Sequence, residues 1–262
     1  MSAELAGEVV LERAGAALVV RFNRPATRNA LTFAMYDALV RTCQGLENQP
    51  EVRVLVITGG PDCFAAGTDL HEFEHLKSGQ DYLAYEERAD EIAEAIESVP
   101  IPTIAAIGGA CTGGGAVIAT ACDLRLVANN VRFGFPIART LGNCVSVANY
   151  TRVALHLGPS LAARLFLSAE LIGAPELLSA GFVSGSCDPS ELERRAAALA
   201  DELSLLAPRT VSASKTVLKA VRDQQRPAID ASALILSCYL SEDFKEGRSA
   251  FLEKRSPRFS GR

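Results

Sequence analysis

The stretch Gly108-Gly109-Ala110-Cys111-Thr112-Gly113-Gly114-Gly115 decides the fold of this chain. A proline-bounded apolar run, residues 100–107, precedes it and predicts a buried strand, and the small residues 116–121 that follow predict a helix. A strand, a glycine turn and a helix start gather unpaired backbone N–H groups in one place. Such a place attracts negative charge, carried either by a phosphate or by a reaction oxyanion.

The composition is that of an ordinary globular protein. The 262 residues are 48% apolar and 22% charged, which suits one large domain or a domain with a helical appendage. A net charge of −5 argues against a nucleic-acid partner, and the seven scattered cysteines indicate neither a disulfide framework nor a zinc ribbon. The first eight residues lack signal-peptide features and no apolar run reaches about 18 residues, so we expect a cytoplasmic protein with no membrane partner.

Strands and helices alternate through the first half of the sequence. The expected elements there are a hairpin (9–13 with 17–22), a helix (33–46) capped by Asn29 or Thr32, a strand buried on both faces (52–58), an acidic helical region (71–98) and two short strands (123–128 and 131–136). We interpret the acidic run from Glu86 to Glu97 as a solvated helix face. From about residue 146 the pattern is mostly helical, with a turn expected near Glu246-Gly247. This order predicts an α/β core with a helical C-terminal extension.

Six segments, in order, resemble motifs of the crotonase (enoyl-CoA hydratase/isomerase) superfamily. They are NRPATRNAL (23–31), FAAGTDL (64–70), the glycine stretch (108–115), CDLR (122–125), APELLSAGFV (174–183) and FLEKR (251–255). The glycine stretch has Gly108-Gly109 where the family usually has Asn-Gly. Each motif is weak alone, but the six in order are specific, and they cover nearly the whole chain.

The resemblance implies an α/β spiral of ββα units with a helical C-terminal region that forms trimers, often doubled to hexamers. It divides the chain into a spiral core, residues 1–200, that binds acyl-CoA and a helical region, residues 201–262. The implied partner is an acyl-CoA thioester, so coenzyme A enters as part of the substrate and no separate cofactor is expected. Two backbone N–H groups polarise the thioester carbonyl in this family, and they map onto Thr68 and Gly114, each worth about 3 kcal/mol.

The same mapping assigns substrate-binding roles around these two residues. The residues implied to line the adenine and pantetheine path, largely through backbone groups, are Ala66, Asp69, Leu70 and His71. Arg28 and Lys254 are candidates to bind the CoA phosphates, and exposed solvated cations explain both of them equally well.

The sequence departs from the family at its two catalytic carboxylates. Hydratases of the family use one glutamate three residues after the oxyanion glycine and another directly after the proline of a Pro-Glu pair. Here these positions hold Val117 and Ile137, which we expect to line the substrate instead. Neither aliphatic side chain transfers a proton, so hydration by two glutamates is not supported. Two hypotheses follow: a lyase or isomerase that stabilises an enolate and uses other proton-transfer groups, or a CoA-ester-binding protein that has lost catalysis.

The segment after Pro136 supplies further candidates. Some non-hydratase members place their catalytic group seven residues after this proline, where this chain has Asn143; an amide orients a water or donates a hydrogen bond but is no general base. We interpret Cys144 as a buried inert thiol rather than a nucleophile. Arg139 either binds a carboxylate on the acyl group or pairs with a structural acid at a trimer contact.

One motif competes with this interpretation. His71-Glu72-Phe73-Glu74-His75 fits H-E-x-x-H, in which two imidazoles at i and i+4 on one helical face hold zinc. The chain has three histidines, so the third ligand would have to be the distant His156 or a carboxylate such as Glu91 or Glu94. Because the pentapeptide directly follows the FAAGTDL motif, we favour the acyl-CoA interpretation, with no bound metal.

Overall fold

The computed structural model describes residues 4–6, 8–225, 227 and 229–261. A large sheet has the strand order β1-β2-β3-β4-β6-β8-β11, antiparallel from β1 to β3 and parallel from β3 onward. Its strands are β1 (Glu4–Ala6), β2 (Val9–Ala14), β3 (Ala17–Phe22), β4 (Val54–Thr58), β6 (Thr103–Ile107), β8 (Leu124–Ala128) and β11 (Gly185–Cys187). The expected N-terminal hairpin is therefore confirmed as β2 and β3.

A second, smaller sheet has the strand order β10-β9-β7-β5. Its strands are β5 (Cys63–Ala65), β7 (Ala110–Thr112), β9 (Arg132–Gly134) and β10 (Leu171–Ile172). In three successive units a strand of the large sheet, a strand of the small sheet and a helix follow one another, and these helices are α2 (Gly79–Ser98), α3 (Gly114–Ala121) and α4 (Ile137–Thr140). Each unit adds its strands beside those of the previous one in both sheets, so the chain advances as the spiral of ββα units that the family resemblance implies.

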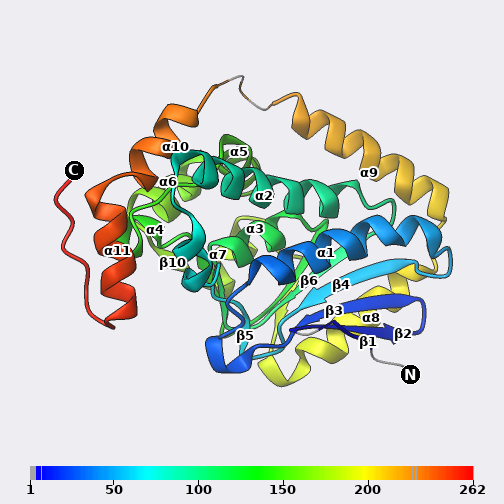
Figure 1. Ribbon diagram of the computed structural model, residues 1–262. Coiled ribbons are helices and arrows are strands. Elements are labelled where there is room, and N and C mark those ends of the chain that lie inside the picture. The colour runs from blue at the N-terminus through cyan, green and yellow to red at the C-terminus, as the bar shows by residue number, and fades with distance from the viewer. Residues whose placement is uncertain (1–3, 7, 226, 228, 262) are drawn as a thin grey trace.

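The central strands are buried on both faces because helices cover both sides of the large sheet (Figure 1). On one side α8 (Leu192–Ser204) packs Leu192, Ala196 and Ala200 against alternate residues of β4, β6 and β8. On the other side α1 (Phe33–Gly45), α2 and α3 enclose the main core. The Thr32 hydroxyl accepts a hydrogen bond from the Met35 N–H and caps α1, which confirms one of the two expected caps.

The second half of the chain is mainly helical. The remaining α-helices are α5 (Val147–Leu157), α6 (Pro159–Leu167), α7 (Ala174–Ser179), α9 (Pro208–Asp223), α10 (Ser232–Tyr239) and α11 (Glu242–Leu252). Short 3₁₀ helices are η1 (Pro25–Thr27), η2 (Leu46–Asn48), η3 (Leu70–His75) and η4 (Pro189–Glu191). None of the described helices has the length and apolar character that crossing a membrane requires.

The C-terminal helices α10 and α11 pack onto η3 and α2 through an aromatic cluster of Phe73, Tyr82, Tyr239 and Phe244. The prediction of a turn near Glu246-Gly247 is wrong, because α11 runs through these residues. The chain turns before Ser241, which caps the start of α11. A Cβ at residue 247 would lie 2.4 Å from the Leu141 carbonyl oxygen, so this glycine permits a close helix contact rather than a turn.

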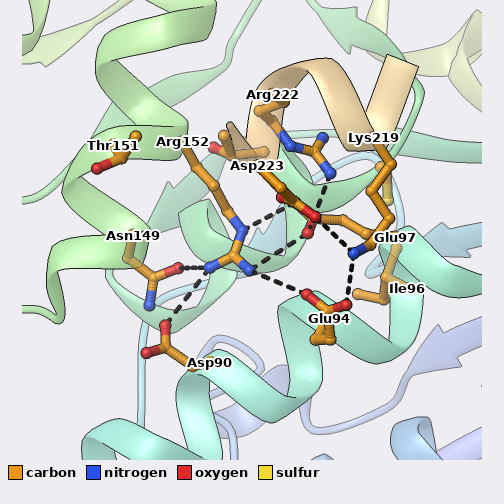
Figure 2. A network of polar contacts seen from close by, with 12 residues as sticks. Asp90, Glu94, Ile96, Glu97, Asn149, Thr151, Arg152, Lys219, Arg222 and Asp223 are labelled. Carbon is orange, nitrogen blue, oxygen red and sulfur yellow. Dashed lines mark hydrogen bonds and ion pairs between the residues drawn. The ribbon is translucent and has the colours of Figure 1, made fainter. Parts of the chain in front are cut away.

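A buried ionic network joins α2 to α5 and α9 (Figure 2). Arg152 donates two hydrogen bonds to the Glu97 carboxylate, at 2.8 and 3.2 Å, and Arg222 contacts the same carboxylate at 3.1 Å. The Arg152 and Glu97 side chains are only 2% and 1% exposed. The prediction that the run from Glu86 to Glu97 is a solvated helix face is thus wrong for its first and last residues. Helices from the second half of the chain cover these two carboxylates.

Candidate active site

The candidate site lies where the turn after β5 meets the turn between β7 and α3. These strands are parallel neighbours in the small sheet, so the segments that follow them lie side by side. Gly115 makes the contact possible, since a Cβ there would lie 2.6 Å from the Ala65 carbonyl oxygen. The tertiary structure thereby brings Thr68 and Gly114, the two residues singled out by the sequence, to one place: a Cβ on Gly114 would lie 3.3 Å from Thr68 Oγ1.

The backbone N–H groups of Thr68 and Gly114 are available to a ligand. Gly114 opens α3, where the first N–H groups have no carbonyl one turn earlier to bond. One neighbouring N–H of each residue is occupied: the Asp69 N–H donates to the Leu31 oxygen at 2.9 Å, and the Gly113 N–H donates to the Gly134 oxygen at 3.2 Å. Within the described part of the chain, neither the Thr68 N–H nor the Gly114 N–H donates to a protein acceptor.

Two tyrosine hydroxyls that sequence reasoning missed stand beside these N–H groups. Tyr36 Oη lies 2.8 Å from Thr68 Oγ1, and Tyr85 Oη lies 2.7 Å from the same oxygen. Burial raises the pKa of both tyrosines, so both keep their protons at neutral pH. The sequence held one signal, a tyrosine on the core-facing side of the helix at 33–46, because a buried hydroxyl requires a partner.

The sequence and the fold of this chain are similar to those of known proteins. The sequence model of the family described as "Enoyl-CoA hydratase/isomerase" matches residues 12–262. This chain belongs to the enoyl-CoA hydratase/isomerase family. It is 35% identical over 251 residues to a "Probable enoyl-CoA hydratase" of Bacillus subtilis, covering 94% of this chain and 95% of the relative. It is 34% identical to the "2,3-dehydroadipyl-CoA hydratase" of Escherichia coli, covering 97% and 99%.

Solved structures show the same fold. The structure of "Methylmalonyl-CoA decarboxylase in complex with 2-nitronate-propionyl-CoA" superimposes with a TM-score of 0.87 and 28% sequence identity, covering 98% of this chain and 99% of the other. The enoyl-CoA hydratase/isomerase fold expected from the sequence motifs is therefore confirmed over nearly the whole chain.

In this family member the two positions expected to carry catalytic glutamates are apolar and buried. The Val117 and Ile137 side chains are 5% and 8% exposed and belong to the main core. Val117 lies one turn into α3, and Ile137 opens α4 directly after Pro136. These two side chains provide packing at positions where a carboxylate would provide acid–base chemistry.

A different carboxylate, Glu86 of α2, is buried near the expected catalytic position. Asn143 donates through Nδ2 to Tyr239 Oη at 3.0 Å, and this hydroxyl donates to Glu86 Oε1 at 2.5 Å. Burial raises the pKa of Glu86 to about 8. The Asn143 Oδ1 atom is buried without a partner among the described residues. Sequence reasoning missed Glu86 and Tyr239, because neither pattern nor spacing joins residues of α2 and α10.

The other candidates after Pro136 differ in their surroundings. Burial raises the pKa of the Cys144 thiol, which disfavours the thiolate and agrees with an inert cysteine. Arg139 is exposed on α4 and forms no ion pair within the described residues, so both of its expected partners, an acyl carboxylate and an acid at a trimer contact, stay predictions.

The predicted coenzyme-binding residues follow β5, but their side chains differ in exposure. Ala66 is half-buried, and its N–H donates to the Arg28 carbonyl oxygen at 3.1 Å. Asp69 is half-buried and accepts hydrogen bonds from Arg24 at 2.8 Å and from the His71 N–H at 3.1 Å. Leu70 is buried, whereas the His71 side chain is 72% exposed. Arg28 and Lys254 both have exposed side chains, and Lys254 lies beyond the end of α11.

The competing metal motif does not form the helix that it needs. Residues Leu70–His75 form a 3₁₀ helix, in which residues i and i+4 are about 120° apart rather than on one face. His71 instead contacts Glu74, with Nδ1 3.1 Å from Oε1. Among the described residues no group of three or more histidine, cysteine, aspartate or glutamate side chains is arranged to hold a metal ion.

Proposed function

We propose that this chain is an enzyme that binds an acyl-CoA thioester and stabilises the enolate form of its acyl group. The observation that carries the proposal is the pair of unpaired N–H groups of Thr68 and Gly114, brought from two separate turns to the start of one helix. Donors preorganised in this way stabilise the oxygen on which charge develops, each by about 3 kcal/mol. Family membership and the CoA-ester hydratases among the relatives support a CoA thioester as the ligand.

The absence of both family glutamates argues for a reaction that needs no paired carboxylates. Activation of a water and delivery of a proton to the α-carbon require two groups, and Val117 and Ile137 supply neither. Decarboxylation of a 2-carboxyacyl-CoA is such a reaction. The bond to the carboxylate breaks, its electron pair passes to the thioester as an enolate, CO₂ leaves, and a proton adds at the α-carbon. The similar structure described as methylmalonyl-CoA decarboxylase supports this choice of lyase reaction.

A second candidate function is binding of a CoA ester without turnover. The same two aliphatic residues favour it, because a site that has lost its acid–base groups still retains the N–H donors that hold the carbonyl. In this case the tyrosine hydroxyls and Asn143 serve to position a ligand rather than to transfer protons.

The remaining features of the proposed protein follow from the family. We propose a homotrimer or a dimer of trimers in the cytoplasm, with coenzyme A entering only as part of the substrate. Several exposed apolar side chains support association between copies; on and beside α9 these are Leu205, Leu206, Val217, Leu218 and Val221. Light scattering on the purified protein tests the assembly, and a monomer would contradict it.

A panel of CoA esters tests the function directly. The purified protein is incubated with crotonyl-CoA, a 3-hydroxyacyl-CoA, malonyl-CoA and methylmalonyl-CoA, and products are identified by mass against a heat-denatured control. We expect loss of CO₂ from a carboxylated ester. Rapid gain of water by crotonyl-CoA would show that the weight placed on Val117 and Ile137 is wrong. Tight binding of esters without any product would favour the second candidate function.

A further inference from the structure

Three hydroxyl groups form a continuous hydrogen-bonded chain beside the two free N–H groups. Tyr36 comes from α1, Thr68 from the turn after β5, and Tyr85 from α2. Thr68 Oγ1 is the central atom, 2.8 Å from Tyr36 Oη and 2.7 Å from Tyr85 Oη. The Tyr36 side chain is only 3% exposed, so its hydroxyl has little access to bulk water.

This chain of hydroxyls has one more proton than its own hydrogen bonds use. Three hydroxyls carry three protons, and the two contacts through Thr68 Oγ1 use two of them. No other acceptor for Tyr36, Thr68 or Tyr85 hydroxyls lies among the described residues. In every arrangement one proton is left to donate to something else. Thr68 and Tyr85 are half-buried, whereas Tyr36 is buried, so an unpartnered donor is most costly at the Tyr36 end.

Tyr36 is the end of the chain that faces the thioester position. A Cβ on Gly114 would lie 2.0 Å from Tyr36 Oη, and a Cα–Cβ bond is about 1.5 Å long, so Tyr36 Oη lies within about 3.5 Å of Gly114 Cα. Helical Cβ atoms point toward the N-terminus of their helix. Tyr36 Oη therefore stands at the end of α3 where the unpaired N–H of Gly114 also projects.

We propose that the Tyr36 hydroxyl donates a third hydrogen bond to the enolate oxygen of the bound thioester, beside the Thr68 and Gly114 N–H groups. Tyr85 and the Thr68 hydroxyl act as positioning groups: Tyr85 donates to Thr68 Oγ1, Thr68 donates to Tyr36 Oη, and the Tyr36 proton is directed to the ligand. Hydrogen bonds aligned in one direction polarise one another, which strengthens the last donor. The inference rests on the proposed function and adds a catalytic residue to it.

A pair of ligands that differ in charge tests the role of Tyr36. Propionyl-CoA presents a neutral carbonyl, whereas the nitronate of 2-nitropropionyl-CoA spreads a negative charge onto the thioester oxygen. Isothermal titration calorimetry gives the affinity of both ligands for the wild-type protein and for Tyr36→Phe. A hydrogen bond to a charged group is worth more than one to a neutral group. We therefore expect Tyr36→Phe to weaken nitronate binding about 10- to 100-fold. The fold-loss for propionyl-CoA should be smaller than the fold-loss for the nitronate by a factor of about five or more.

Two further variants separate this role from a structural one. Tyr82→Phe removes a buried hydroxyl that contacts the Leu76 carbonyl oxygen instead, and should leave the nitronate-to-propionyl affinity ratio unchanged. Tyr85→Phe should lower the ratio by a smaller factor than Tyr36→Phe. Equal losses for both ligands in a folded Tyr36→Phe protein, or no loss for the nitronate, would overturn the inference while leaving the proposed function intact. A wild-type protein that binds neither ester would overturn both.

Discussion

A methyl group added at Gly114 should reveal how closely Tyr36 approaches the start of α3. In Gly114→Ala the new Cβ would lie 2.0 Å from Tyr36 Oη, so the hydroxyl must retreat by about 1.5 Å to reach an ordinary contact distance. Overpacking of a buried ring costs about 1–3 kcal/mol, and the broken hydrogen bond to Thr68 adds about 1 kcal/mol. Replacing a glycine returns about 0.4–1 kcal/mol through the unfolded chain. We expect a net loss of about 1–3 kcal/mol of unfolding free energy.

Removing the Tyr36 hydroxyl should abolish the loss of stability that Gly114→Ala causes. Without Oη, the nearest atom of residue 36 to the new Cβ is Cζ at 3.3 Å, which needs only a slight adjustment. In the Tyr36→Phe background, Gly114→Ala should therefore change stability by less than about 0.5 kcal/mol. Urea unfolding followed by circular dichroism, at one protein concentration for all variants, measures the four stabilities of the cycle.

Gly45→Ala is a matched control that tests whether the loss of stability is specific to position 114. Gly45, the last residue of α1, also gains a Cβ in Gly45→Ala, but the nearest atom would be a flexible Gln49 side-chain nitrogen at 3.9 Å. This variant should be as stable as wild type or slightly more so. Wild-type stability in Gly114→Ala, or an equal loss with and without the Tyr36 hydroxyl, would refute the proposed contact.

Three other predictions concern buried charge and the metal motif. The pKa of Glu86 is raised from 4.5 to about 8, so its carboxyl ionises at lower pH in the unfolded chain than in the folded protein. The unfolding free energy should therefore fall between about pH 4.5 and pH 8, by up to about 1.4 kcal/mol per pH unit. Unfolding experiments on Glu86→Gln should show a weaker dependence on pH. Arg152→Met should lower the unfolding free energy by about 3–5 kcal/mol because it removes the bidentate partner of buried Glu97. Arg164→Met, at an exposed ion pair that solvent screens, should lower it far less. Protein purified without added metal should contain no stoichiometric zinc, and a zinc signal lost in His71→Ala would contradict the assignment of this segment.

Much of the fold can be predicted from local pattern. An apolar run without polar alternation predicts a strand buried on both faces, and β4 is buried along its whole length. Glycines followed by small residues predict a turn and a helix start, and α3 begins at Gly114. These predictions succeed because each depends on residues within a few positions of one another.

The residues of the site are predicted less completely. The pairing of Thr68 with Gly114 follows from family motifs, and β5 beside β7 is the physical reason for it. Local pattern fails at the H-E-x-x-H segment, because both α and 3₁₀ geometry are compatible with the same letters. It fails again at Tyr85, where no local signal distinguishes a tyrosine that bonds Thr68 from one that only fills space.

By itself the sequence determines the alternation of strands and helices, the glycine turn at the start of α3, and the absence of carboxylates at residues 117 and 137. Only the tertiary structure decides which polar groups on these elements lose contact with water. Glu86 and Glu97 belong to one acidic helix, and each is buried because α10, α5 or α9 returns from far along the chain to cover it. Burial depends on these distant partners, so the raised pKa of Glu86 is a property of the assembled fold.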